Sequence, residues 1–288
     1  MSIVVTGATG HYGGLVVKHL IERGTPAADI IAAGRNEQRL AQLASEYGVR
    51  TAPIDYDKPE TLSKAFTGAD SVLLVSGPTL GTRVQQHKNV VDAARESGVK
   101  LLAYTSVLDA EHSPLAVAPD HRATEEYIKK SGVPYVFLRN AWYTENYAAD
   151  VEQASKTGVI ESAAGDGAIA SATRDDLADA AAVVLSNPGK YRNTTLELSV
   201  DQTFTYADLA AVASAITGRE VVYKNVTTDQ LAEDLSAAGL PKDAVSWVVK
   251  LAADTASGAL SAKHSDKLAN IVGHKLTGLE DGLRAALK

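Results

Sequence analysis

The sequence predicts an α/β fold in which a doubly wound parallel sheet is accompanied by a smaller, mostly helical C-terminal lobe. The first observation is that short apolar runs alternate with amphipathic stretches through the first half of the chain, as in parallel strands joined by crossover helices. The second is the length, because 288 residues, or 30.2 kDa, suit one large domain and a smaller lobe. The third is a glycine-rich turn directly after the first apolar run.

That turn lies in the opening stretch "MSIVVTGATGHYGGLVVKHL". Residues 3–5 are apolar, Gly7, Gly10 and Gly13 recur at spacing three, and apolar residues then follow at helical spacing. A strand, turn and helix of this kind are typical of the first unit of a Rossmann-type sheet, where glycines let the backbone approach a phosphate at the helix N-terminus. We therefore expect a dinucleotide pyrophosphate here. A strand-to-helix turn without a ligand is the alternative.

The remaining elements are predicted in order along the chain. Further strands of the sheet are expected at 29–34, "VRTAPIDY", "DSVLLVSG", "KLLAYTS" and "VPYVFLR", with helices at 37–47, 59–66 and 83–97. The second half predicts a loop or hairpin at "AAGDGAIA", a helix capped by Thr173, a strand at "NTTLELSV", a helix at 205–218, a strand at "EVVYKNV" and then short helices. We place the dinucleotide-binding domain at residues 1–145, with returning segments near 155–200, and a smaller lobe that forms one wall of the substrate pocket at 201–288.

The composition argues against several classes of function. The formal net charge is -7 and the basic residues are scattered, so we expect no nucleic-acid partner. No apolar run approaches the roughly twenty residues that cross a bilayer, and the first strand begins at once, so we expect no membrane segment, no secretory signal and a cytoplasmic protein. The seven histidines show no ligand spacing and cysteine is absent, so we expect no metal site.

Arg35 stands where a dinucleotide fold selects between its two nucleotides. It follows the second predicted strand in "AAGRN", at the distance from the glycines where an acidic residue would accept from a ribose 2′-hydroxyl. A guanidinium at this position pairs with a 2′-phosphate instead, which favours NADP over NAD. Arg39, one helical turn later, is a candidate to assist. A solvated arginine at a strand end is the alternative.

The motifs "VTGATGHYGG", "GRN", "APIDY", "QQHKNVVDAA", "GVKLLAYTS", "HRATEEY" and "FLRNAWYTEN" resemble those of the NmrA-like branch of the atypical short-chain dehydrogenases/reductases. Within that branch the pattern is similar to the bacterial NADPH-dependent quinone oxidoreductases, with the triphenylmethane-dye reductases nearby. The resemblance covers nearly the whole chain, including "AAGDGAIASATRDDLA" in the second half. It implies an NADP(H)-dependent oxidoreductase.

The resemblance also implies which residues meet the cofactor. Those around the pyrophosphate would be Gly7, Ala8, Thr9, Gly10, His11 and Tyr12. Arg35 would meet the 2′-phosphate, Asp55 and Tyr56 would lie beside the adenine, and Ser76, Gly77 and Pro78 would run along the cofactor. The nicotinamide and the substrate entrance would be bordered by Asn140, Ala141, Trp142, Tyr143, Thr144 and Glu145.

The proton relay of the wider superfamily is missing. Ser106 follows the fifth predicted strand, but the positions of the relay tyrosine and lysine hold His121 and Glu125. A carbonyl reduced to an alkoxide needs a proton at once, whereas a quinone becomes a delocalised hydroquinone anion that water or a weak acid can protonate. The missing relay therefore argues against alcohol dehydrogenation and favours hydride transfer from NADPH to a quinone, which asks the protein mainly for positioning and a dry pocket.

Two side chains are candidates for a catalytic role. His121 is a candidate to donate a proton or to hydrogen-bond the substrate, with Glu125 one turn along the same helix to orient it. Tyr143 is a candidate to stack on a flat quinone or a similar conjugated acceptor, with Trp142 at its edge. The alternatives are a helix-surface pair and packing in the core, respectively.

Two other functions stay open. An NADP(H)-binding sensor that turns nothing over fits a missing relay equally well, and a reductase of triphenylmethane-type dyes is a third possibility. We expect a monomer or a homodimer.

Overall fold

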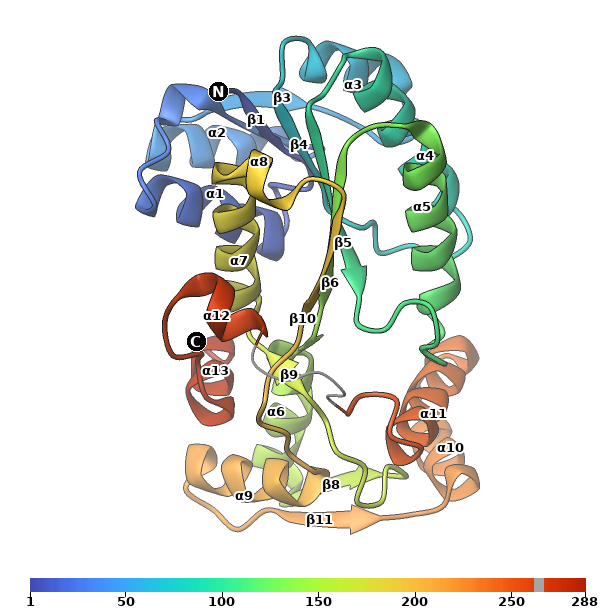
Figure 1. Ribbon diagram of the computed structural model, residues 1–288. Coiled ribbons are helices and arrows are strands. Elements are labelled where there is room, and N and C mark those ends of the chain that lie inside the picture. The colour runs from blue at the N-terminus through green and yellow to red at the C-terminus, as the bar shows by residue number, and fades with distance from the viewer. Residues whose placement is uncertain (262–266) are drawn as a thin grey trace.

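The computed structural model describes residues 1–261 and 267–288. Its centre is a seven-stranded sheet in which every neighbouring pair is parallel (Figure 1). The strands are β1 (Ile3–Val5), β2 (Ile30–Gly34), β3 (Arg50–Pro53), β4 (Ser71–Leu74), β5 (Leu101–Val107), β6 (Tyr135–Asn140) and β10 (Thr194–Leu198). Their order is β10-β6-β5-β4-β1-β2-β3. Strands β1 to β3 are added towards one edge of the sheet and the later strands towards the other, so the strand order reverses between β1 and β4. The predicted doubly wound α/β sheet is confirmed.

Helices cover both faces of the sheet, as crossover connections require (Figure 1). On one face α1 (His11–Glu22), α2 (Glu37–Tyr47), α7 (Arg174–Ser186) and α12 (Lys267–Val272) bury apolar side chains in a shared core. On the other face α3 (Pro59–Phe66), α4 (Arg83–Glu96) and α5 (Ala118–Ser131) form a second core. The inner strands are buried on both faces, which explains their uninterrupted apolar sequences.

The chain returns to the large sheet after residue 170. Thr173 caps α7 by accepting a hydrogen bond from the Asp176 amide, as the sequence predicts. After the short α8 (Pro188–Tyr191), β10 pairs with β6 at the edge of the sheet. The predicted strand "NTTLELSV" therefore belongs to the large lobe.

The smaller lobe lies beyond the carboxyl ends of the strands (Figure 1). It contains α6 (Ala148–Thr157), α9 (Tyr206–Thr217), α10 (Thr228–Ala237), α11 (Lys242–Ala256), α13 (Leu279–Ala286) and a parallel pair of β8 (Val159–Ser162) with β11 (Val222–Asn225). β8 comes before residue 201 in the chain, and α12, which comes after it, packs against α7 of the large lobe. We therefore propose that segments from both sides of residue 201 build the smaller lobe.

Two short elements join the lobes. Directly after β6, β7 (Trp142–Tyr143) pairs in parallel with β9 (Ser171–Ala172), and a single turn of 3-10 helix follows over Thr144–Tyr147. The segment "AAGDGAIA" before β9 is a loop with turns. In the described ranges no helix is long and apolar enough to cross a membrane.

Candidate active site

A cavity of about 650 Å³ opens at the carboxyl ends of β1, β2 and β4, where the strand order reverses. Ligands of open α/β sheets bind at this position. The sequence-predicted residues that line it are Gly7, Thr9, Gly10, Arg35, Asp55, Tyr56, Ser76, Gly77 and Pro78. The fold thus brings together residues from four separate loops. The lining residues that were not predicted are Gly34, Asn36, Ile54, Val75, Thr79 and Gln86.

The glycine turn fits an anion in this cavity. Gly7 has a positive φ of 61°, and a Cβ added to Gly13 would lie 2.4 Å from the Gly7 carbonyl oxygen, so α1 can pack this closely only with glycine. α1 begins after Gly10 without a side-chain cap and without an acidic residue in its first turn. Its first N–H groups therefore stay free to donate, and the helix dipole favours a phosphate there.

Arg35 and Tyr56 also line this cavity. Arg35 follows β2 directly and is exposed at the cavity. The Tyr56 hydroxyl lies 2.5 Å from Thr6 Oγ1 and donates to the Val75 carbonyl at 2.9 Å, which fixes its ring beside the cavity. Burial raises the pKa of Tyr56, so its phenol is neutral. Arg39 donates instead to Gln42 at 3.0 Å and does not line the cavity.

Gly34 explains how β2 approaches the glycine turn. A Cβ at this position would lie 2.7 Å from the side chain of Thr9. The glycine in "AAGRN" was a signal for this contact that sequence reasoning did not use.

The loop after β4 is held by α4. His87 Nε2 accepts a hydrogen bond from the Gly77 amide at 3.1 Å, and Arg83 donates to the carbonyls of Gly77 at 2.6 Å and Pro78 at 3.3 Å. Burial, with the nearby Arg83 charge, lowers the pKa of His87 to about 3. The imidazole is therefore neutral, as a ring that accepts at Nε2 must be.

Several predicted cofactor residues turn their side chains away from the cavity. Ala8, Tyr12 and Ala141 are buried in the core around α1 and α7, and Tyr12 donates to the Leu177 carbonyl at 3.1 Å. Thr144 is also buried, with its hydroxyl 2.8 Å from that of Ser171. His11 is exposed at the start of α1. Only the backbones of the four buried residues are available to a nucleotide.

Tyr143 packs against protein groups. Its ring centroid lies 6.2 Å from that of Tyr12, with the planes 24° apart, and the Arg174 guanidinium carbon lies 4.7 Å from it. Asn140 donates to its hydroxyl at 3.3 Å. Stacking of an acceptor on Tyr143 stays a prediction, and an acceptor would compete with these groups for the ring.

Two polar atoms beside Tyr143 lack hydrogen-bond partners. Asn140 Oδ1 and Glu145 Oε2 are buried without a hydrogen bond to any part of the chain that the structure describes. Glu145 Oε1 accepts a hydrogen bond from the Arg174 backbone amide at 2.8 Å. Glu145 Oε2 forms a weak ion pair with the Arg174 guanidinium, 3.7 Å away. Buried polar atoms left over in this way are typical of a binding site.

The residues at the relay position are engaged in two separate networks. Ser106 donates to Glu125 at 2.6 Å, and Glu125 pairs with Arg139 through two hydrogen bonds of 2.9 and 2.6 Å. His121 Nδ1 lies 2.7 Å from the Tyr104 hydroxyl. Glu125 therefore binds Arg139 and not His121. The side chain that hydrogen-bonds His121, and so orients it, is Tyr104. Burial, with the charge of Arg83, lowers the pKa of His121 to about 3.

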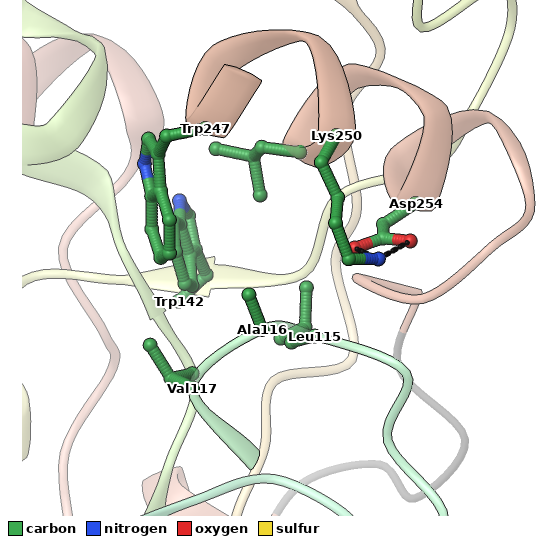
Figure 2. A pocket seen from close by; sticks show the side chains of 8 residues that line it. Leu115, Ala116, Val117, Trp142, Trp247, Lys250 and Asp254 are labelled. Carbon is green, nitrogen blue, oxygen red and sulfur yellow. Dashed lines mark hydrogen bonds and ion pairs between the residues drawn. The ribbon is translucent and has the colours of Figure 1, made fainter. Parts of the chain in front are cut away.

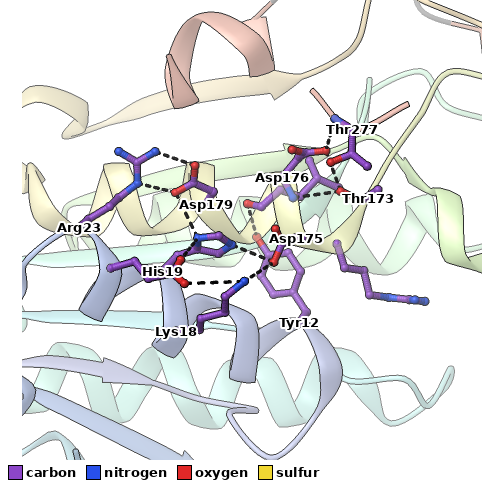
Figure 3. A network of polar contacts seen from close by, with 12 residues as sticks. Tyr12, Lys18, His19, Arg23, Thr173, Asp175, Asp176, Asp179 and Thr277 are labelled. Carbon is purple, nitrogen blue, oxygen red and sulfur yellow. Dashed lines mark hydrogen bonds and ion pairs between the residues drawn. The ribbon is translucent and has the colours of Figure 1, made fainter. Parts of the chain in front are cut away.

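A polar network joins α1 to α7 behind the glycine turn (Figure 3). His19 Nε2 and Lys18 Nζ lie 3.0 and 3.2 Å from Asp175 Oδ1, and Arg23 pairs with Asp179 through both of its carboxylate oxygens. The hydrogen bond from His19, opposed by burial, lowers the pKa of Asp175 to about 2. This network fixes the helix whose N-terminus faces the cavity.

Known protein families and proteins are similar to this chain in sequence. A model of the NmrA-like family matches residues 1–280. Quinone oxidoreductase 2 of Escherichia coli is 38% identical over 281 residues, which cover 98% of this chain and 97% of that protein.

Solved structures agree. The crystal structure of an NADPH-dependent quinone oxidoreductase from Escherichia coli complexed with NADPH superposes with a TM-score of 0.93 at 38% identity, covering 99% of this chain and all of the other. The Citrobacter sp. triphenylmethane reductase complexed with NADP(H) superposes with a TM-score of 0.90 at 40% identity, again covering 99% and 100%.

Proposed function

The chain belongs to the NmrA-like family, and from this premise we propose that it is an NADPH-dependent oxidoreductase that transfers a hydride to a quinone. The observation that carries the proposal is the cavity at the strand-order reversal, which is lined by the glycine turn before an uncapped helix N-terminus and by Arg35. The similarity to an NADPH-dependent quinone oxidoreductase over almost the full length supports it.

The cavity residues fit NADPH. The Gly7–Gly10 turn and the start of α1 would receive the pyrophosphate, Arg35 would pair with the 2′-phosphate, and Tyr56 would border the adenine. The loop at 76–78 would run along the nucleotide in the position that Arg83 and His87 impose. The unpartnered oxygen of Asn140 suits an amide donor at the nicotinamide end. When bound, NADPH supplies the hydride.

The chain's own residues offer no proton relay, which suits a quinone. Ser106 is tied to Glu125, and His121 is buried and neutral near neutral pH, so neither is ready to release a proton. We assign His121 the role of a neutral hydrogen-bonding group next to Tyr104. The reduced quinone leaves as a stabilised anion and is protonated by water. The protein positions the reactants and excludes water from them.

A steady-state assay tests this function. Purified protein with NADPH and 1,4-benzoquinone, 2-methyl-1,4-naphthoquinone or a soluble ubiquinone should consume NADPH faster than protein-free controls, and NADH should be a poorer donor. No acceleration with any of these quinones would remove the proposal. In that case, NADPH binding measured by calorimetry would point to the sensor function.

A second candidate is the reduction of a triphenylmethane-type dye. The likeness to the Citrobacter triphenylmethane reductase favours it. Decolourisation of crystal violet by the protein with NADPH, at a kcat/KM above that for every quinone, would make the dye class the better substrate. We further propose that the protein is a cytoplasmic monomer or homodimer without a nucleic-acid partner. The net charge of -7 and the scattered basic residues support the absence of a nucleic-acid partner.

A further inference from the structure

Both tryptophans of the chain line one small cavity. Trp142 comes from β7 in the joint between the lobes, and Trp247 comes from α11, more than a hundred residues later. In Figure 2 the two indoles lie on one side of the cavity, Lys250 and Asp254 lie on the other, and the segment 115–117 lies below. The cavity is separate from the nucleotide crevice and shares no lining residue with it.

The lining has the chemistry of a site for a flat, apolar molecule with one acceptor atom. Leu115, Val117 and Leu251 supply aliphatic walls. Lys250 and Asp254 satisfy each other at 2.9 Å, so their charges are not offered to a ligand. Each indole also brings an N–H donor, and that of Trp142 is buried and has no hydrogen-bond partner among the described residues. A buried donor is costly to leave unpaired, so a ligand atom that accepts from Trp142 Nε1 is favoured here.

The position of the cavity relates it to the reacting end of the cofactor site. In the sequence Trp142 lies between Asn140, whose Oδ1 has no hydrogen bond among the described residues, and Tyr143, which packs on Tyr12 of α1. The segment 115–117 leads directly into α5, which carries His121. Because side chains alternate along a strand, Trp142 and Tyr143 point to opposite faces of β7. Trp142 therefore faces the smaller lobe.

We propose that Trp142 and Trp247 form the acceptor-binding wall, with the quinone ring packed against the indoles and one of its carbonyl oxygens accepting from Trp142 Nε1. This inference rests on the proposed function and names the part of the site that selects the substrate. Electron-rich indoles pack favourably against an electron-poor ring. Larger fused rings gain more contact than a single ring, so bicyclic quinones are the preferred class.

Binding requires Trp247 to move. The cavity holds about 10 Å³, which is far less than a quinone needs. α11 packs with α10, in which Leu231 is the one buried side chain, and its hydrogen bond to the segment before α5 is a long one of 3.5 Å from Lys250 to the Pro114 carbonyl. α11 also buries Val245, Ala252 and Thr255, so the movement falls to its half-buried Trp247. An outward shift of Trp247 makes room for the acceptor.

Intrinsic fluorescence tests the proposal without turnover, because Trp142 and Trp247 are the two tryptophans of the chain. Trp142→Phe and Trp247→Phe each leave one reporter. Titration with 2-methyl-1,4-naphthoquinone, without NADPH, should quench both reporters along one saturable curve. N-acetyltryptophanamide, measured in parallel, reports collisional quenching and inner-filter loss. Quenching that stays linear and equal to that of the free compound in both variants would overturn the proposal.

Kinetics separate this inference from the proposed function. Trp247→Ala should raise KM for 2-methyl-1,4-naphthoquinone by about tenfold while kcat and the NADPH Kd change by less than about twofold, and Trp247→Phe should restore most of the loss. Trp142→Phe, which removes the donor and part of the ring surface, should raise KM by about fivefold. Turnover with an unchanged KM in all three variants would place the acceptor elsewhere and leave the proposed function standing. Saturable quenching without turnover would support the acceptor-binding wall and contradict the proposed function.

Discussion

The Ser106 hydroxyl donates a 2.6 Å hydrogen bond to Glu125, and this contact joins the position of the superfamily's catalytic serine to a buried ion pair. Glu125 binds Arg139 through both oxygens, and Arg139 also binds Glu197 on β10 at 2.8 Å. The residues that would form a relay therefore link α5 to the carboxyl ends of β5, β6 and β10. This arrangement suits a reaction in which positioning matters more than proton transfer.

Glu125→Gln should destabilise the fold. It leaves the buried Arg139 with Glu197 as its main charged partner. Breaking a buried ion pair costs about 3–5 kcal/mol when the remaining charge is uncompensated, so we expect a loss at or below the lower end of that range. Urea unfolding measures the change. Glu111→Gln is the matched control, because Glu111 meets the same guanidinium at 3.3 Å from an exposed position and should cost less than about 1 kcal/mol. Equal losses in the two variants would contradict the buried role of Glu125.

Arg35→Ser should weaken NADPH binding by about 10- to 100-fold and leave NADH binding nearly unchanged, because it removes the charge that pairs with the 2′-phosphate. Calorimetric titration of both nucleotides measures this. Arg39→Ala serves as the control, since Arg39 donates to Gln42 outside the cavity lining and should alter NADPH affinity by less than about threefold. A parent protein that binds the two nucleotides equally would rule out Arg35 as the discriminator.

His121→Gln should keep kcat within about threefold of the parent, because a neutral amide replaces a neutral imidazole at the Tyr104 hydroxyl. The pKa of His121 lies at about 3, so the ring stays uncharged above about pH 4. The pH profiles of kcat/KM should therefore be alike near pH 6.5 in the parent and the variant, with no inflection there that depends on His121. Such an inflection would identify His121 as the proton donor after all.

Asp175→Asn should lower stability near neutral pH. The folded-state pKa of Asp175, at about 2, lies below its usual value of 3.8, so its contribution is present above about pH 4 and is lost as the pH falls towards 2. The carboxylate is 45% exposed, and with solvent screening we expect a loss of about 1 kcal/mol. Urea unfolding at about pH 7 and pH 3 should show the difference shrinking in acid. Asp201→Asn, in an exposed loop, should show no such trend.

Local sequence patterns predicted most of the fold. Apolar runs of strand length located the sheet strands, and the Thr173 cap located α7. Because parallel strands place their carboxyl ends at one edge, the order of strands along the chain is enough to group the residues that follow β1, β2, β3 and β4. Arg35, Asp55 and Tyr56 do line one cavity.

The rest of the site depends on long-range packing or on patterns that were not used. Tyr12, Val16 and Leu20 recur every four residues and share the buried face of α1, so helical periodicity could have shown that Tyr12 turns inward. No local pattern predicts that Arg139 binds both Glu125 and Glu197. The same holds for Trp247, because its meeting with Trp142 depends on how α11 packs across the joint between the lobes.

The most direct test of the central claim is a single-turnover reaction of the protein with NADPH and 2-methyl-1,4-naphthoquinone, using nicotinamide deuterated in turn at each face of its C4 position. We expect one hydroquinone per NADPH oxidised. Deuteration of one face should slow the reaction by a primary isotope effect, whereas deuteration of the other face should not. NADPH oxidation no faster than in the absence of protein, or with no isotope effect from either face and no hydroquinone formed, would contradict direct hydride transfer to the quinone.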